Sequence, residues 1–231
     1  MRIAIRIMAI IFAIILCFVF LLSAIRYVAF NQDIYRRIQV KQKIAEFVLM
    51  DQNELDNITK GLIDYMKGDR DDLVIYRDSD DQKNEVFNDR EKKHMVDVRM
   101  LFDLSISVIV VLLSILGLII ISGMLMDMEI MKRIFIKTVA IAMLIFVILM
   151  IMLIFYMIVD FQNFWLIFHE TVFTNDLYFL DPYTDILINI MPLDFFISIC
   201  LNISLYFGLL FSGAFAIMYG TKVLKRIVNH E

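Results

Sequence analysis

The sequence predicts an all-α membrane protein with four transmembrane helices. Hydrophobic residues make up 61% of the 231 residues, and the mean hydropathy of +0.76 is far above that of a soluble domain. Only two prolines and seven glycines interrupt the chain, so long apolar stretches can be helical. Helix is the expected spanning form because backbone groups must pair internally in lipid. Four uncharged runs reach the ~20 residues that cross a bilayer, namely 7–25, 104–126, 138–159 and 195–221.

The charges between these runs predict the orientation. The segment 160–194 carries six acids and no Lys or Arg, whereas basic residues flank the opposite span ends: Arg2, Arg6, Lys132, Arg133, Lys137, Lys222, Lys225 and Arg226. By the positive-inside rule both termini are expected in the cytoplasm. The expected layout is a cytoplasmic N-terminus (1–6), an extracytoplasmic domain (26–103), a cytoplasmic loop (127–137), an extracytoplasmic loop (160–194) and a cytoplasmic tail (222–231).

The first run is expected to be an uncleaved anchor. Its 19 residues exceed the ~7–15 of a signal-peptide core, and no small-x-small cleavage site follows. Cys17 and Cys200 both lie within runs, so we expect them to pack as apolar side chains and not to form a disulfide in the outer domain. The net charge of −4, with no dominant basic patch, gives no indication of a nucleic-acid partner.

The domain 26–103 is expected to be mostly helical. Apolar residues recur at helical spacing over 33–50 and again over 51–67, where Gly68 is a natural stop. A short β-hairpin is expected around the polar turn 78–83, between 73–76 and 85–87.

Asn88 and Glu91 have the spacing of a capping box, which predicts a helix that runs unbroken into the second span. His94 lies on this helix and shares a face with Asp97. Asp97 is expected to orient or charge-stabilise His94, although a solvated surface acid would show the same spacing.

Two histidines stand at equal distances from two different runs. His94 is ten residues before Leu104, and His169 is ten residues after Val159. If both runs continue as helix, each imidazole lies roughly 15 Å beyond the hydrocarbon edge, at ~1.5 Å per residue. Both would then be on the same side of the membrane at the depth of the lipid head groups. This placement indicates proton-transfer chemistry at the membrane surface.

The loop 160–194 combines aromatic and acidic residues. Its aromatic cluster after the third span is typical of an interfacial belt, and consists of Phe161, Phe164, Trp165 and Phe168. Apolar residues alternate with the later acids, which predicts a segment lying on or slightly in the bilayer. Two readings stay open for these acids: they point toward a common centre, or they face water from an amphipathic belt.

The sequence lacks the motifs of several common enzyme classes. His169-Glu170 is not a zinc-protease motif, because Phe173 stands where the second histidine belongs. Only two usable histidines and no outer cysteine are present, so neither a catalytic metal nor another cofactor is expected, and carboxylates of Asp181 or Asp185 do not by themselves indicate a site. A nucleophile elbow, a P-loop and a dinucleotide fingerprint are also lacking. Two histidines with nearby carboxylates fit general acid–base catalysis, with lipid esters as reactants at this depth.

These same residues resemble the lipoprotein intramolecular transacylase (Lit) family. Residues 87–98, FNDREKKHMVDV, look like its first signature. The second is matched by Phe168-His169-Glu170, Asn175-Asp176, Asp181-Pro182, Asp185, Leu187-Ile188, Pro192 and Phe195-Phe196. The two regions, 87–102 and 164–196, are the part that carries the resemblance, together with the four-span layout. Tyr178 stands where the family pattern has Trp, which leaves the contacts at that position open.

The resemblance implies a bacterial plasma-membrane enzyme with its active site at the outer-leaflet interface. Its substrates would be diacylglyceryl-modified lipoproteins, and it would work among membrane lipids. The sn-2 acyl chain would move from glycerol onto the free α-amine of the N-terminal cysteine, giving a lyso-form lipoprotein. The family's catalytic histidines match His94 and His169. We expect supporting roles, in orientation or oxyanion stabilisation, for Arg90, Asp97, Glu170, Asn175, Asp181 and Asp185.

Other functions remain as alternatives. A non-enzymatic sensor or partner-binding protein would suit the long outer domain, and would tolerate His-to-Gln changes at both positions. A relative that acylates another lipid would keep the same site. A transporter is disfavoured because the four runs contain no charge. The sequence leaves the oligomeric state open, and a monomer is compatible with it.

Overall fold

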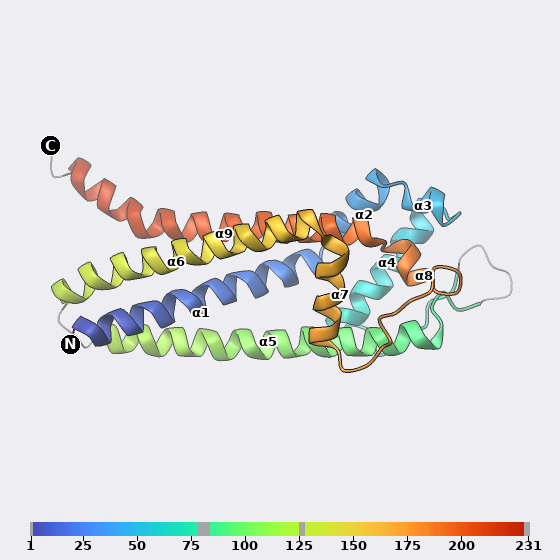
Figure 1. The fold of residues 1–231 in the computed structure, drawn as a ribbon, viewed down its shortest axis with the longest axis horizontal. Helices are drawn as coiled ribbons and strands as arrows, with labels where there is room; N and C mark the ends of the chain where they lie inside the picture. The colour runs from blue at the N-terminus through green and yellow to red at the C-terminus, as the bar shows by residue number, and fades with distance from the viewer. Residues whose placement is uncertain (1, 78–83, 125–127, 229–231) are drawn as a thin grey trace. The chain divides into compact units, whose positions relative to one another are not determined.

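The computed structural model describes residues 2–77, 84–124 and 128–228 (Figure 1). The helices of these residues are α1 (Arg2–Ala29), α2 (Gln32–Lys41), α3 (Ile44–Phe47), α4 (Gln52–Lys67), α5 (Asp89–Met124), α6 (Met128–Val159), α7 (Phe161–Val172), α8 (Ile186–Ile190) and α9 (Leu193–Val228). Four of them, α1, α5, α6 and α9, are long and apolar enough to cross a membrane. The predicted all-α membrane fold with four transmembrane helices is confirmed, and the protein is a multi-pass membrane protein.

The predicted hairpin is not found. Within the described residues there is no β-strand, and the two arms meet in one isolated antiparallel bridge between Tyr76 and Glu85. The expected turn 78–83 lies outside the described residues, as do 125–127 and His230. Two arms of four and three residues are too short to form a ladder that holds without further strands.

The chain forms two compact units. Unit 1 consists of 1–25, 107–155 and 203–231, and unit 2 consists of 26–106 and 156–202. The four long helices therefore contribute segments to both units, whereas α2, α3, α4, α7 and α8 belong wholly to unit 2.

Unit 1 has a core of small side chains on α1. Ala9, Ala13 and Cys17 follow one another at four-residue spacing and pack against Val139 and Met143 of α6. Small residues let two helices approach closely, which is how helices associate in lipid, where there is no hydrophobic driving force between them. Cys17 is a free, buried thiol in this cluster and packs as an apolar side chain, as predicted.

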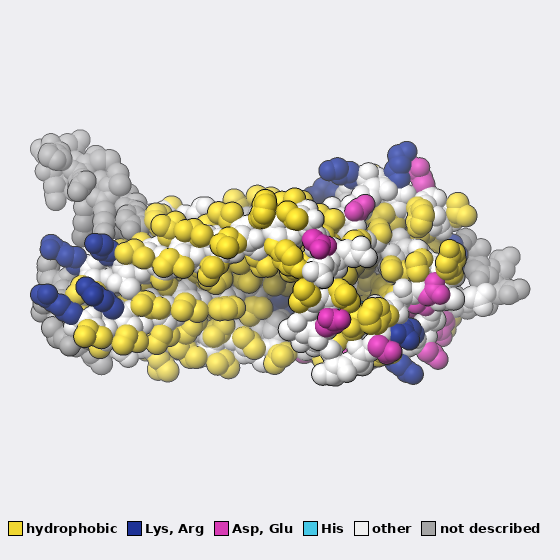
Figure 2. All heavy atoms as spheres, in the orientation of Figure 1, with side chains coloured by type: hydrophobic (Ala, Val, Ile, Leu, Met, Phe, Trp, Pro, Cys, Tyr) yellow, Lys and Arg dark blue, Asp and Glu magenta, His cyan; other side chains and the backbone are white. Residues whose placement is uncertain are grey.

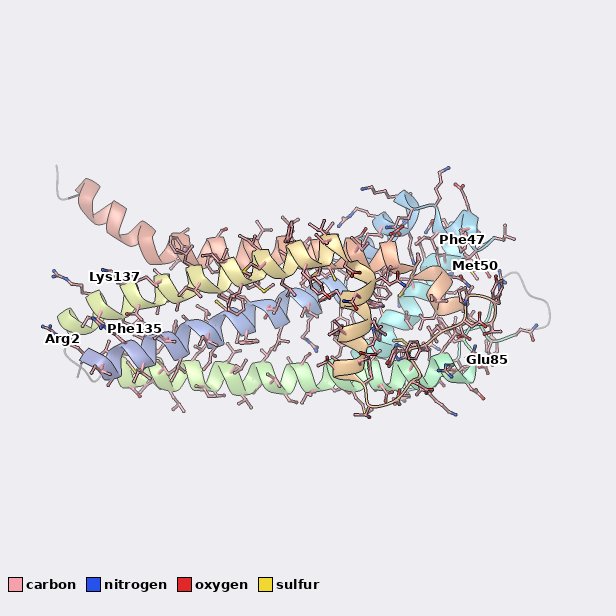
Figure 3. The ribbon with its side chains drawn as sticks, viewed as in Figure 1. Arg2, Phe47, Met50, Glu85, Phe135 and Lys137 are labelled. Atoms are coloured by element: carbon pink, nitrogen blue, oxygen red, sulfur yellow. The ribbon has the colours of Figure 1, made fainter. Side chains whose placement is uncertain are left out.

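The outside of unit 1 is apolar. Figure 2 shows hydrophobic side chains along its helices, and the exposed ones include Val110, Leu118, Ile148 and Leu209. Arg2 and Lys137 lie at the same end of this unit (Figure 3). An apolar surface that ends in basic residues is the pattern that the positive-inside rule associates with a cytoplasmic end.

In unit 2, the helices α2 and α4 follow the predicted pattern closely. Helix α4 begins after the cap Asp51, whose side chain accepts a hydrogen bond from the backbone N–H of Asn53, and it ends at Gly68, with φ of 85°. The two helices pack on each other across a buried hydrogen bond of 3.1 Å from Gln39 to Thr59. The predicted segment 33–50 is interrupted, because Lys43 is left-handed and separates α2 from the short α3.

Candidate active site

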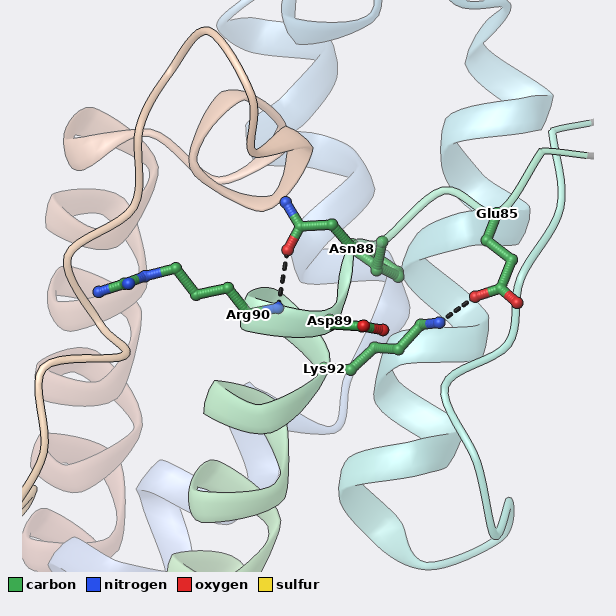
Figure 4. Close-up of a pocket in the computed structure, with 6 residues that line it drawn as sticks. Glu85, Asn88, Asp89, Arg90 and Lys92 are labelled. Carbon is green, nitrogen blue, oxygen red and sulfur yellow. Dashed lines mark hydrogen bonds and ion pairs between the residues drawn. The ribbon is translucent and has the colours of Figure 1, made fainter.

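The site begins at the first turn of α5, where the predicted capping box is present. The Asn88 side chain accepts a hydrogen bond of 2.9 Å from the N–H of Arg90 (Figure 4). It also accepts one of 3.0 Å from the N–H of Glu91, and the Glu91 carboxylate accepts from the Asn88 N–H at 2.7 Å. The second Glu91 oxygen accepts the Leu187 N–H of α8 at 2.6 Å. Glu91 is only 1% exposed, and burial raises the pKa of its carboxyl although these hydrogen bonds lower it. This carboxylate thus joins the start of α5 to the start of α8.

His94 follows one turn later and is 7% exposed. Its Nδ1 atom is buried and has no hydrogen-bond partner among the described residues. Burial is the main cause that lowers the pKa of His94, to about 4; the nearby His169 and Arg90 lower it further, and Asp97 raises it. His94 is therefore a neutral imidazole at neutral pH.

His169 is positioned by a separate helix. Helix α6 ends at Val159, and the side chain of Asp160 caps α7 by accepting the N–H of Asn163 at 3.1 Å. The condition that both runs continue as helix to the histidines is met by α5, which runs unbroken from Asp89 through the second span. It is not met by the third span, which ends at Val159, as the charge of Asp160 predicted, before a new helix carries His169. The distance of His169 from the bilayer cannot be derived from helix rise.

A backbone carbonyl fixes the tautomer of His169. Its Nδ1 lies 2.7 Å from the carbonyl oxygen of Trp165, which can only accept, so Nδ1 carries the proton. The lone pair of the neutral ring is then on Nε2. Burial lowers the pKa of His169, and the bond to Trp165 raises it in part. His169 is thus held as a neutral imidazole in one tautomer.

The two imidazoles lie together inside an aromatic surround. Their ring centroids are 6.1 Å apart, and His169 is also only 7% exposed. Phe173 contacts both rings, at 5.1 Å from His94 and 5.6 Å from His169, and Tyr178 lies 4.9 Å from His169. Trp165 packs against His169 from its own helix, at 4.7 Å. The sequence predicted this pair; it gave no sign of Phe173, Tyr178 or the Trp165 carbonyl as its neighbours.

The residues that were expected to support the histidines contact other groups or solvent. Asp97 accepts a hydrogen bond of 2.8 Å from the Asn175 amide, so it affects His94 through its charge. The Arg90 guanidinium donates to the backbone carbonyls of Asp176 and Phe179. Glu170 is exposed, and the tautomer of its neighbour His169 is set by the Trp165 carbonyl.

Of the two loop acids Asp181 and Asp185, one is buried and the other is exposed. Asp185 is 4% exposed and accepts hydrogen bonds from the Asp181 N–H, the Asn88 amide and the Thr184 hydroxyl, at 2.7, 2.6 and 3.0 Å. Burial would raise the pKa of Asp185, but these bonds outweigh it and lower the pKa. Asp181 is exposed, and its carboxylate accepts the N–H of Tyr183. Only Asp185 of this pair faces inward, and it ties the loop to α5.

The surface of unit 2 has hollows. One, of about 690 Å³, is lined by Glu85, Phe87, Asn88, Asp89, Arg90 and Lys92 at the start of α5 (Figure 4). The other, of about 570 Å³, is lined by Arg26, Tyr27, Phe30, Asn31, Gln32 and Asp33. Neither is lined by the histidine pair. No group of three or more His, Cys, Asp or Glu with the spacing to hold a metal occurs within the described ranges.

Comparison with solved structures shows the same fold in membrane-integral lipoprotein intramolecular transacylase Lit from Bacillus cereus. One structure has a TM-score of 0.73 at 20% sequence identity, covering 96% of this chain and 98% of that chain. Two others are variants in which a histidine is replaced by arginine or by alanine. Their TM-scores are 0.75 and 0.74, both at 18% identity; they cover 97% of this chain and 95% and 96% of their own chains.

A comparison with curated proteins gives no match. The family model of the lipoprotein intramolecular transacylase Lit, in contrast, matches residues 10–196, which include both histidines and most of the chain. The chain therefore belongs to the lipoprotein intramolecular transacylase family and is an acyltransferase.

Proposed function

We propose that this protein moves the sn-2 acyl chain of an S-diacylglyceryl-cysteine lipoprotein onto the α-amine of that cysteine, by acid–base catalysis at His94 and His169. The observation that carries the proposal is the pair itself: two buried, neutral imidazoles with ring centroids 6.1 Å apart. Family membership supports the substrate class. We place the site at the outer leaflet, with both termini in the cytoplasm.

The reaction needs one base and no energy source. The amine nitrogen attacks the ester carbonyl carbon, and a C–N bond forms. The amine loses one proton, the bond from the carbonyl carbon to the glycerol oxygen breaks, and that oxygen gains one proton. An ester becomes an amide, and amine and ester belong to one molecule, so a high effective molarity supplies much of the rate.

The hydrogen bond from His169 to Trp165 supports different roles for the two histidines. Nε2 of His169 takes the amine proton as the C–N bond forms, and the same imidazolium returns it to the departing glycerol oxygen. Neutral His94 has one N–H, which we assign to stabilise the tetrahedral oxyanion. Arg90 and Asn175 are less suited to that task, because Arg90 already donates to two loop carbonyls and Asn175 to Asp97.

Mass spectrometry of a lipoprotein N-terminal peptide tests the function. The peptide is taken from a bacterial host that has no N-acylating enzyme, with and without this chain. The proposal predicts one acyl group on the amine and one on glycerol, only when the chain is present and not with His94→Ala or His169→Ala. A diacylglyceryl peptide with a free amine, despite confirmed membrane expression, would favour a sensor or another acyl acceptor.

A further inference from the structure

A short segment covers the histidine pair. In residues 173–179, the rings of Phe173 and Tyr178 lie 6.2 Å apart and contact the imidazoles. Phe173 is buried, whereas Thr174, Asn175 and Asp176 between the two rings are exposed. The segment thus lies between solvent and the imidazoles. We call residues 173–179 the aromatic cover.

The Arg90 side chain bonds the turn that carries Tyr178. The Phe179 N–H bonds the Asp176 carbonyl at 3.1 Å, which closes a turn around Leu177 and Tyr178. Arg90 donates from Nε to the Phe179 carbonyl at 3.1 Å and from Nη2 to the Asp176 carbonyl, so it is hydrogen-bonded to both ends of this turn. Its charge also lies 3.8 Å from the Asp176 carboxylate. Figure 4 shows the Arg90 side chain extending from α5 to this loop.

Arg90 acts four residues before His94 on the same helix. The helix that carries one histidine therefore fixes the cover over both. A second bond, from Asn175 to Asp97 one turn further along α5, holds the other half of the cover. The rigid fork of a guanidinium suits two carbonyls at once, and an ammonium, a compact charge with rotatable donors on a single nitrogen, does not reproduce that geometry.

We propose that Arg90 is a positioning residue that decides the acyl acceptor, because it holds the aromatic cover closed and so keeps water from the ester. This inference rests on the proposed transacylase function and goes beyond it. With the cover displaced, water attacks the ester carbonyl carbon, and the bond to the glycerol oxygen breaks. A free fatty acid and a lyso-lipoprotein with a free amine result. Amine and water thus compete for one carbonyl, and the cover sets the ratio.

The test uses the purified full-length protein, a synthetic S-(2,3-diacyloxypropyl)-cysteine peptide in detergent micelles, and H₂¹⁸O. Mass spectrometry counts N-acyl peptide against fatty acid that carries ¹⁸O. For Arg90→Lys we expect the hydrolysis-to-transfer ratio to rise at least about tenfold and kcat to fall, with KM changed less, since misplacement by ~1 Å costs up to about a hundredfold. The matched control is Arg99→Lys, the same change on α5 at a side chain that bonds the Arg70 carbonyl.

Each outcome decides something. A product ratio for Arg90→Lys equal to that of Arg99→Lys overturns the proposal. If Arg90→Lys does not fold, Tyr178→Ala is measured in its place. A raised hydrolysis-to-transfer ratio for Tyr178→Ala, with Tyr178→Phe closer to wild type, supports the role of the aromatic cover. A wild-type ratio for Tyr178→Ala overturns the proposal. If the wild type itself forms no N-acyl peptide, the proposed function fails first, and the positioning role fails with it.

Discussion

One hydrogen bond distinguishes the two imidazoles. His169 donates Nδ1–H to the Trp165 carbonyl, whereas Nδ1 of His94 is buried and has no partner within the described residues. A ring whose tautomer is fixed presents one free lone pair, which suits a base. The neutral ring of His94 beside it keeps one N–H, which suits the role of a hydrogen-bond donor.

The two histidines are therefore expected to respond differently to glutamine. At position 169, Gln and Ala should both cost ~10²–10⁴ in kcat, because an amide cannot act as a base. His94→Gln should be roughly tenfold or more faster than His94→Ala, because the amide N–H can replace part of an oxyanion donor that contributes ~10²–10³ to the rate. Single-turnover rates of N-acyl product measure this. Equal losses for both substitutions at position 94 would contradict the donor role.

Both imidazoles should also titrate at low pH. Burial lowers the pKa of each in the folded protein, so the unfolded chain takes up protons first as the pH falls from about 6.5. Stability should then decline between pH 6.5 and about 4, the folded pKa of His94. Imidazole ¹³C shifts in detergent, assigned with His94→Gln and His169→Gln, measure the titration. A midpoint at or above 6.5 for either ring would contradict the buried, neutral pair.

At the scale of elements, the N-terminal part of α5 is hydrogen-bonded to the chain between α7 and α9. Asn88, Arg90, Glu91 and Asp97 each bond the loop between α7 and α9, and His94 lies among them. A single helix thus positions His94 and the segments around it. Precise placement on a rigid element is what acid–base catalysis requires.

Glu91 is the member of this group with the largest expected effect on stability. Glu91→Ala should lower the free energy of unfolding by about 3 kcal/mol, because the buried N–H of Leu187 and the partly buried N–H of Asn88 lose their charged acceptor. Lys93→Ala on the same turn is exposed and should change it by less than about 0.5 kcal/mol. Thermal or denaturant unfolding in detergent measures both. Equal stabilities would show that Glu91 does not join α5 to α8.

Elements governed by local rules could be predicted from the sequence. The Asp51 cap and Gly68 stop of α4 and the capping box of α5 follow from side-chain-to-backbone bonds within a few residues. The end of the third span at Val159 agrees with the uncharged run, whereas the separate helix α7 that follows the Asp160 cap was not foreseen, because no Pro or Gly marks a new helix start there. The expected hairpin is not found, since its two short arms meet in a single bridge among the described residues.

At the scale of the whole molecule, orientation is the remaining expectation. A membrane-impermeant maleimide on intact cells should label Asp69→Cys of the outer domain and leave Lys137→Cys unlabelled. Both side chains are exposed, so access depends on the membrane alone. Arg2 and Lys137 at one end of unit 1 support this direction. Labelling of Lys137→Cys alone would reverse the proposed topology and place the histidine pair in the cytoplasm.

The candidate site could be predicted only in part. His94 and His169 followed from their positions beside two runs, and the family signatures agreed. The partners of Arg90, Asp97 and Glu91 could not be found, because these side chains bond groups that lie 78 to 96 residues away in the sequence. Such contacts depend on the tertiary fold and leave no local pattern.

A crossover experiment distinguishes acyl transfer within one lipoprotein molecule from transfer between molecules. Two substrates are mixed with the purified protein: one is isotopically heavy in both acyl chains and peptide, and the other is light in both. The account predicts N-acyl peptides that are wholly heavy or wholly light, with the amide acyl group drawn from the sn-2 position and no product from His169→Ala. Mixed products, or transfer that survives the loss of His169, would contradict an intramolecular reaction at this histidine pair.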